Sequence, residues 1–288
     1  MSETLLRSEI IRSHQGAREF GVIEKELTIF ERLYNQGWLR KMVMLVLLAA
    51  AWEAYARHLD NPLLVPTFAD TVSAWWDAVS SGVLPARAAV SLQVLAIGFT
   101  SGVVLAGVLT VLAITTRIGT DFLETMTAMF NPLPAIALLP LALIWFGLGI
   151  GSLVFVLIHS VLWAVALNTH AGFRGVSQTL RMVGRNYGLS GLRLVLNILI
   201  PAAFPSILAG LKIGWAFAWR TLIAAELVFG VASGKGGLGW FIFESKNQLD
   251  IPSVFAGLLT IIMIGLVVEN IIFGTIENRT VRRWGMQS

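Results

Sequence analysis

The feature that most constrains the fold is a series of long apolar runs, each close to the length that crosses a lipid bilayer. A hydrocarbon core of about 30 Å needs ~20 mostly apolar residues per helix. Six segments fit this description, at residues 42–56, 88–114, 127–146, 152–168, 202–229 and 253–273. With 56% hydrophobic and 13% charged residues, the chain carries more apolar surface than one water-soluble core hides. The sequence therefore predicts an integral membrane protein and excludes a soluble enzyme or a disordered scaffold.

The spans are expected to be helices. Lipid offers no hydrogen-bond partner to an open backbone, so only helices or closed barrels cross it. The continuous apolar runs lack the short alternating strands of a barrel. We therefore predict an all-α fold of six transmembrane helices, with a membrane domain over residues 42–273 and tails at residues 1–41 and 274–288.

The basic residues predict how the chain is oriented. Fifteen of the 21 Lys and Arg residues fall on the side of the two tails, four fall on the opposite side, and two lie within the fifth span. Because Lys and Arg accumulate in cytoplasmic loops, both termini are expected in the cytoplasm. The net charge of +4 is thereby explained by orientation, and no nucleic-acid partner is expected.

The tail before the first span has an apolar stripe at near-helical spacing: Leu27, Phe30, Leu33, Tyr34, Trp38 and Leu39. We interpret it as an interfacial helix lying on the cytoplasmic face of the membrane. The alternative is a solvated amphipathic tail helix.

Motifs for catalysis, nucleotide binding and metal binding are not found. The chain has no cysteine, and its four histidines have no ligand-like spacing. The segment Gly234-Lys235-Gly236 lacks both the hydroxyl residue and the earlier glycine of a phosphate-binding loop. We therefore predict that the chain is not an enzyme and holds no cofactor or metal of its own.

The longest cytoplasmic loop, residues 171–199, is amphipathic, because Leu180, Val183, Tyr187 and Leu194 recur near helical spacing among arginines. A surface helix with an apolar face either lies on lipid headgroups or inserts into a partner's groove. Periodicity does not decide between these two interpretations.

The same loop resembles a signature of ABC importer permeases. That signature has Glu-Ala-Ala, three residues, Gly, nine residues and Ile-x-Leu-Pro. Here the chain has Met182-Val183-Gly184, three residues, Gly188, nine residues and Ile198-Leu199-Ile200-Pro201. The spacing from Gly to Pro is the same, whereas Met182 replaces the acidic residue.

The resemblance extends from Trp52 to Trp284 and points to the nitrate, taurine, alkanesulfonate and bicarbonate subfamily. Supporting segments in chain order include Pro132-Leu133-Pro134-Ala135, Trp145-Phe146-Gly147 and Trp219-Arg220-Thr221 with Glu226. The resemblance implies an ABC importer permease fold in which this loop forms a coupling helix that docks on a separate ATPase. The implied docking residues are Met182, Val183, Gly184, Arg185, Tyr187, Gly188, Leu189, Ile198 and Pro201.

The resemblance also implies a bacterial-type inner membrane and several partners. These are ABC ATPase subunits that bind ATP and Mg, an extracytoplasmic solute-binding protein and a second permease copy. One chain of six spans does not enclose a pore, so a C2 homodimer is the simplest arrangement. The pairs Gly98/Gly102 and Gly210/Gly214 permit close helix approach, either across that dimer or within one chain.

The fifth span is polar for a membrane helix. Lys212 and Arg220 share one stripe, Trp215 and Trp219 the neighbouring one, and Glu226 lies on the tryptophan stripe. Such groups commonly face a cavity or a partner. The solute-pathway candidates are Gln93, His159, Trp163, Trp215, Trp219, Arg220, Thr221 and Glu226.

Structural roles remain open for these candidates. Arg220 pairs with Glu53 or Glu269, or it attracts an anionic solute. Lys212 extends its amine toward the membrane surface, and the tryptophans pack between helices or against lipid.

The function that we expect is a permease subunit of an ATP-driven importer, with no catalysis of its own, for a small anionic solute. The alternatives are a secondary transporter driven by an ion gradient, and a permease of the same family that carries a neutral or heteroaromatic solute.

Overall fold

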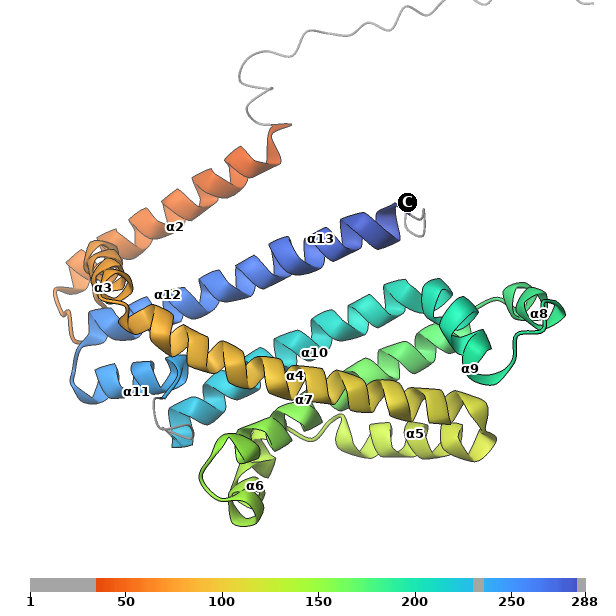
Figure 1. Cartoon of the computed structure of the whole chain (residues 1–288). Helices are drawn as coiled ribbons and strands as arrows, with labels where there is room; N and C mark the ends of the chain where they lie inside the picture. The colour runs from red at the N-terminus through yellow and green to blue at the C-terminus, as the bar shows by residue number, and fades with distance from the viewer. Residues whose placement is uncertain (1–34, 230–235, 284–288) are drawn as a thin grey trace, which may run out of the picture. The chain divides into compact units, whose positions relative to one another are not determined.

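Figure 1 shows the computed structural model of the chain, which describes residues 35–229 and 236–283. All regular elements within these two ranges are helical, which confirms the predicted all-α class. The chain divides into two compact units, Met1–Ala51 and Trp52–Ser288. Most of the predicted interfacial helix, residues 27–34, lies outside the described residues. Trp38 and Leu39 fall in the first turn of α2 (Gly37–Leu59).

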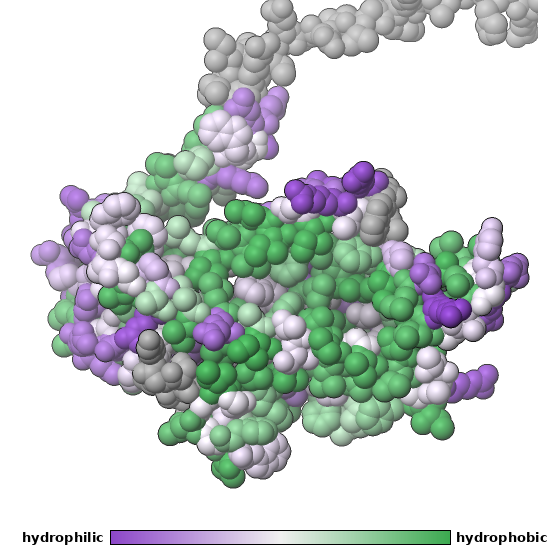
Figure 2. All heavy atoms as spheres, in the orientation of Figure 1, coloured by the Kyte–Doolittle hydropathy of each residue, from purple (hydrophilic) through white to green (hydrophobic). Residues whose placement is uncertain are grey.

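Five helical segments are long and apolar enough to cross a membrane, and they correspond to five of the six predicted spans. They are Gly37–Leu59, Val83–Thr115, Ile150–Gly175, Gly191–Val228 and Ile251–Arg282. On the face drawn in Figure 2, apolar residues cover the middle of the second unit. Polar residues gather near its two ends, around α8 and around α3 and α11. This distribution is that of a protein embedded in a bilayer.

The predicted third span, residues 127–146, is not one continuous helix. α5 (Arg117–Phe130) ends at Phe130, and the chain resumes in the 3₁₀ turn η1 (Ala135–Leu138) and in α6 (Leu139–Phe146). The two parts are bent by 88°. Pro132 and Pro134 in the break have no amide hydrogen to donate and restrict the residues before them, so they disfavour continuation of the helix. The hydropathy pattern predicts one apolar span here but does not predict the break within it.

α7 (Ile150–Gly175) packs along both α4 (Val83–Thr115) and α10 (Ile200–Phe229). The contacts are close because the neighbouring helices present glycines. A Cβ added to Gly98 or Gly102 would lie 2.5 Å or 2.7 Å from the Cβ of Leu157 or Val161 on α7. Gly210 and Gly214 approach the same helix from α10. Both glycine pairs therefore pack within one chain, which is one of the two arrangements that their spacing permits.

The fifth span begins earlier than predicted. A helical run starts at α9 (Gly191–Leu194), continues through the π-helical turn η2 (Val195–Leu199) and becomes α10. Pro201 and Pro205 lie inside this run and do not initiate it. The loop between the fourth and fifth spans is correspondingly shorter, and it holds only α8 (Gln178–Asn186).

The last span is also composite. α12 (Ile251–Val267) passes into the π-helical turn η3 (Val268–Phe273), then α13 (Gly274–Glu277) and a second π-helical turn, η4 (Asn278–Arg282). α11 (Leu238–Asn247) precedes α12. The helical run therefore extends past residue 273, where the sequence places the end of the span.

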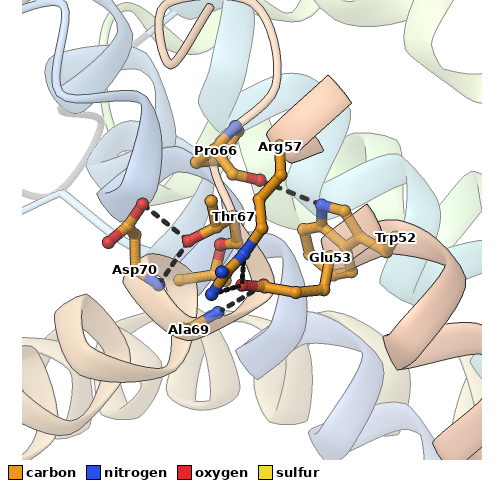
Figure 3. A network of polar contacts seen from close by, with 8 residues as sticks. Trp52, Glu53, Arg57, Pro66, Thr67, Ala69 and Asp70 are labelled. Carbon is orange, nitrogen blue, oxygen red and sulfur yellow. Dashed lines mark hydrogen bonds and ion pairs between the residues drawn. The ribbon is translucent and has the colours of Figure 1, made fainter. Parts of the chain in front are cut away.

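The end of α2 within the second unit is fastened to the start of α3 (Phe68–Ser80), as Figure 3 shows. The Trp52 indole donates to the carbonyl of Pro66 at 3.0 Å. The Glu53 carboxylate accepts from Arg57 Nε at 2.7 Å and from the backbone amide of Ala69 at 3.2 Å. Glu53 is thus engaged by its own helix and by the first turn of α3.

Candidate functional site

A cavity of about 390 Å³ lies where the third span is broken. One wall is the break itself, residues 130–136, and the other walls come from α7 and α10. The residues from those two helices are His159, Ser160, Trp163, Phe217, Arg220, Thr221 and Ala224. The proline-containing segment is thus positioned opposite the two central helices of the bundle.

The cavity contains hydrogen-bond donors and no carboxylate among its lining residues. Arg220 is exposed, its Nε donates to the carbonyl of Ala216 at 3.1 Å, and its guanidinium carbon lies 5.2 Å from the centroid of the Phe217 ring. Ser160 Oγ donates to Thr221 Oγ1 at 3.0 Å. This lining is suited to a solute that accepts hydrogen bonds and carries negative charge.

The structure brings together four of the eight pathway candidates from the sequence, namely His159, Trp163, Arg220 and Thr221. The other four lie elsewhere. Gln93 is exposed on α4, outside the cavity lining. Trp215 and Trp219 stack on each other at 6.1 Å, with Trp219 buried in the main hydrophobic core.

The eighth candidate, Glu226, is 3% exposed and belongs to what we name the carboxylate junction: Ser91, Glu226 and the amides of Leu238 and Gly239. Ser91 Oγ lies 2.8 Å and 2.9 Å from the two Glu226 oxygens and accepts from the Leu238 amide at 2.9 Å. Glu226 also accepts from the Gly239 amide at 2.9 Å. The N-cap of α11, Gly237, has no side chain, so α4 and α10 satisfy the amides of its first turn. Sequence spacing left this long-range contact unseen.

The other two charged residues of the fifth span, Lys212 and Arg220, differ in whether they form ion pairs within the described residues. Lys212 Nζ lies 2.6 Å from Glu277 and 4.0 Å from Glu269, so it joins α10 to the C-terminal helical run. No carboxylate of the described residues forms an ion pair with Arg220. The carboxylates that sequence reasoning offered as its partners are engaged otherwise, Glu53 with Arg57 and Glu269 near Lys212.

Sequence reasoning missed the break residues Phe130 and Asn131 as cavity-lining groups. Phe130 stacks on Trp163 with ring centroids 5.3 Å apart and lies edge-on to His159 at 6.2 Å. The Asn-Pro-Leu-Pro segment that follows Phe130 was the available signal, because two prolines within a span mark a break and a break can line a cavity.

A second candidate surface is the loop helix α8. Its first turn is capped by Ser177, whose hydroxyl accepts from the Leu180 amide at 3.4 Å. Arg181 fixes the helix to the end of α7, since it donates to the carbonyls of Phe173 and Val176. α8 is therefore anchored to the bundle although it lies in a connection.

Gly184 within α8 and Gly188 just after its end have different roles. Gly184 is buried, and a Cβ there would lie 2.7 Å from Leu194 Cδ1 and 3.0 Å from Ile198 Cγ1. Gly188 has a φ of 77° and follows the helix end, where its amide donates to Arg185 and the next amide, that of Leu189, donates to Gly184. These two bonds define a Schellman motif, which favours glycine at this position.

α8 and its surroundings leave large apolar side chains exposed. They are Leu180, Met182, Val183, Tyr187, Leu192 and Leu196, with Tyr187 at 83% exposure. Gly184, Leu194 and Ile198 form the inner contact, whereas these six side chains remain exposed. Of the predicted docking residues, Met182, Val183 and Tyr187 are therefore surface groups, whereas Gly184 packs inward.

Comparison with known proteins decides the class. A sequence model of the family described as "Binding-protein-dependent transport system inner membrane component" matches residues 98–282. The chain belongs to this family. Its members are permease components and are not enzymes themselves. The match covers the broken span, α8 and the carboxylate junction apart from Ser91.

Relatives of this permease place it in the nitrate, taurine and sulfonate group of ABC permeases. The nitrate import permease protein NrtB of Synechocystis sp. is 28% identical, over 83% of this chain and 88% of its own length. The taurine transport system permease protein TauC of Escherichia coli is 32% identical, over 51% of this chain and 52% of its own. The predicted class of multi-pass inner-membrane permease is confirmed.

Proposed function

We propose that this permease imports a small anionic solute in a complex driven by ATP, with ATP and Mg bound by separate ATPase subunits. The further partners are an extracytoplasmic solute-binding protein and a second copy of the chain. In this arrangement the permease forms the pathway and transmits ATPase movement to it. Both termini lie in the cytoplasm, on the side where Lys and Arg residues are concentrated.

The observation that carries this proposal is that α8 is anchored to the bundle and exposes apolar residues. The helix presents Met182, Val183 and Tyr187 outward while Gly184 and Arg181 hold it to the bundle. A surface helix with an exposed apolar face fits a groove on a partner, and its anchoring transmits force to α7 and α10. Met182 stands in place of the family's acidic residue, so docking here relies on apolar contact at that position.

The cavity at the broken span supports an anionic solute. Arg220 faces it without an ion-pair partner among the described residues, and no carboxylate lines it. Nitrate and taurine, after which two of the relatives are named, both carry an oxyanion group. A neutral or heteroaromatic solute is the second candidate, because the stacked Phe130 and Trp163 rings suit a flat apolar group.

A transporter driven by an ion gradient is the alternative of a different class. Family membership supports an ATP-driven permease instead. The carboxylates within the described spans are also engaged, Glu226 by Ser91 and Glu277 by Lys212, which leaves neither as an open site for a coupling cation.

The test is to tag the chain at its C-terminus, extract it from its host in mild detergent and identify co-purifying proteins by mass spectrometry. We expect a stoichiometric protein with a phosphate-binding-loop ATPase motif. A Met182→Asp/Val183→Asp variant, which places charge on the docking face, should lose this partner yet still insert into the membrane. Recovery of the intact chain alone, even after crosslinking, would refute the ATP-driven proposal.

A further inference from the structure

Three buried nitrogen atoms beside the cavity have no hydrogen-bond partner among the described residues. They are Nδ1 and Nε2 of His159 and Nε1 of Trp163. Buried polar groups are nearly always paired, since an unpaired one loses its hydrogen bonds to water without replacement. The indole N–H is a donor only, and a neutral imidazole has one donor and one acceptor. The described part of the site therefore lacks an acceptor for the indole and imidazole N–H groups.

Phe130 packs against both rings that carry these atoms. Its ring stacks on Trp163 at an interplanar angle of 12° and meets His159 edge-on. Phe130 is the last residue of α5, immediately before the break where the span bends by 88°. Pro132, two residues later, donates no backbone hydrogen bond. The ring is thus attached at a break in the span, where a change of backbone angle displaces it.

We propose that Phe130 is a gate residue over a site for the oxyanion group of the solute, with His159, Trp163 and Arg220 as the hydrogen-bond donors. This inference rests on the proposed function, because it places the solute in the cavity at the broken span. To that function the inference adds the gating role of Phe130 and the set of hydrogen-bond donors.

In the closed arrangement the Phe130 ring occupies the face of Trp163 and shields both polar side chains. When the ring moves aside, the oxyanion accepts from the indole and imidazole N–H groups and from the guanidinium of Arg220. Charge-assisted bonds of this kind are stronger than neutral ones. Because the oxyanion satisfies donors that the closed arrangement leaves unpaired, it binds the uncovered arrangement better and shifts the population toward it.

The natural absence of cysteine permits a direct test on the full chain in lipid nanodiscs. Ala224→Cys places one thiol in the cavity lining, one helical turn beyond Arg220. Two methanethiosulfonate reagents of similar size are compared, one bearing a sulfonate and one a trimethylammonium group. Each rate is divided by the rate of the same reagent with a free thiol in solution.

The sulfonate reagent is expected to react about tenfold faster than the cationic one, because the guanidinium of Arg220 attracts the sulfonate and repels the trimethylammonium group. Arg220→Gln should abolish this preference, and excess methanesulfonate should protect the thiol. Equal rates for the two reagents would overturn the oxyanion site, including the case in which an acid from a second copy neutralises Arg220.

The gate is tested in the same Ala224→Cys background. Phe130→Ala should raise the sulfonate rate severalfold, and the milder Phe130→Leu should give an intermediate rate. Phe122→Ala is the matched control, since Phe122 lies exposed on the same helix and should leave the rate unchanged. No acceleration in folded Phe130→Ala and Phe130→Leu proteins, as judged by gel filtration, would overturn the gate.

These measurements need no partner protein. Failure of the gate or of the anion preference therefore leaves the co-purification result intact. Failure to recover an ATPase refutes the proposed function on its own.

Discussion

Replacement of Gly188 provides a sharp test of how α8 is held. The φ of 77° lies in the left-handed region, where an L residue pays roughly 1–2 kcal/mol. A Cβ at this position would meet no atom within 4 Å, so Gly188→Ala changes backbone energy without creating a clash. The penalty acts on the Schellman turn and hence on the end of the helix that carries Met182, Val183 and Tyr187.

The expected size follows from a population argument. If the ATPase binds only the native turn, a penalty of roughly 1–2 kcal/mol lowers the population of that turn, relative to competing conformations, about 5–30-fold. The apparent dissociation constant of the ATPase should rise by up to that factor. Its value is measured by titrating labelled ATPase onto the permease in nanodiscs.

Two control variants isolate the backbone effect. Gly188→Asn should lose little, because asparagine tolerates the left-handed region better than alanine. Gly175→Ala should be neutral, since Gly175 has open space around its Cβ and no positive φ. If Gly188→Ala binds the ATPase as tightly as the unmodified chain, the turn does not control docking and the reasoning fails.

Three further predictions concern stability. Ser91→Ala should lower the free energy of unfolding by about 1–3 kcal/mol, because the carboxylate junction loses a donor to its carboxylate and an acceptor for a buried amide; an unchanged thermal midpoint in detergent would contradict this. Lys212→Glu should destabilise the protein and Glu277→Lys in the same chain should restore about 1 kcal/mol, measured as a coupling energy in a double-mutant cycle. Gly102→Leu should abolish folded expression because the side chain collides with α7, whereas Gly107→Leu, with open space at its Cβ, should express normally; equal yields by fluorescence-detected gel filtration would refute the packing account.

The candidate site was partly accessible from sequence. Arg220, Thr221, His159 and Trp163 stood out because polar and aromatic groups within apolar runs are unusual, and the cavity includes all four. The role of Glu226 was not accessible, because its partner Ser91 is 135 residues away and the contact depends on how three helices meet.

The role of the paired glycines could likewise be predicted only in part from the sequence. The spacing of Gly98/Gly102 and Gly210/Gly214 indicated close helix contacts but did not identify the opposite surface, which is α7 of the same chain. The motif contains a glycine at position 188, and only the structure shows that this residue has a left-handed φ.

The sequence by itself determined which segments lie in lipid and which lie in water. Run length and charge distribution indicate a helical membrane protein, and the loop motif together with the other family-like segments in chain order indicates its family, because each signal comes from residues close together in the chain. Only the tertiary structure decided that the broken third span forms a cavity wall, which charges pair, and which aromatic ring packs against the side chains with unpaired donors. Those outcomes depend on contacts between helices distant in sequence, and hydropathy, which sums the preference of each residue for lipid or water, contains no information about such contacts.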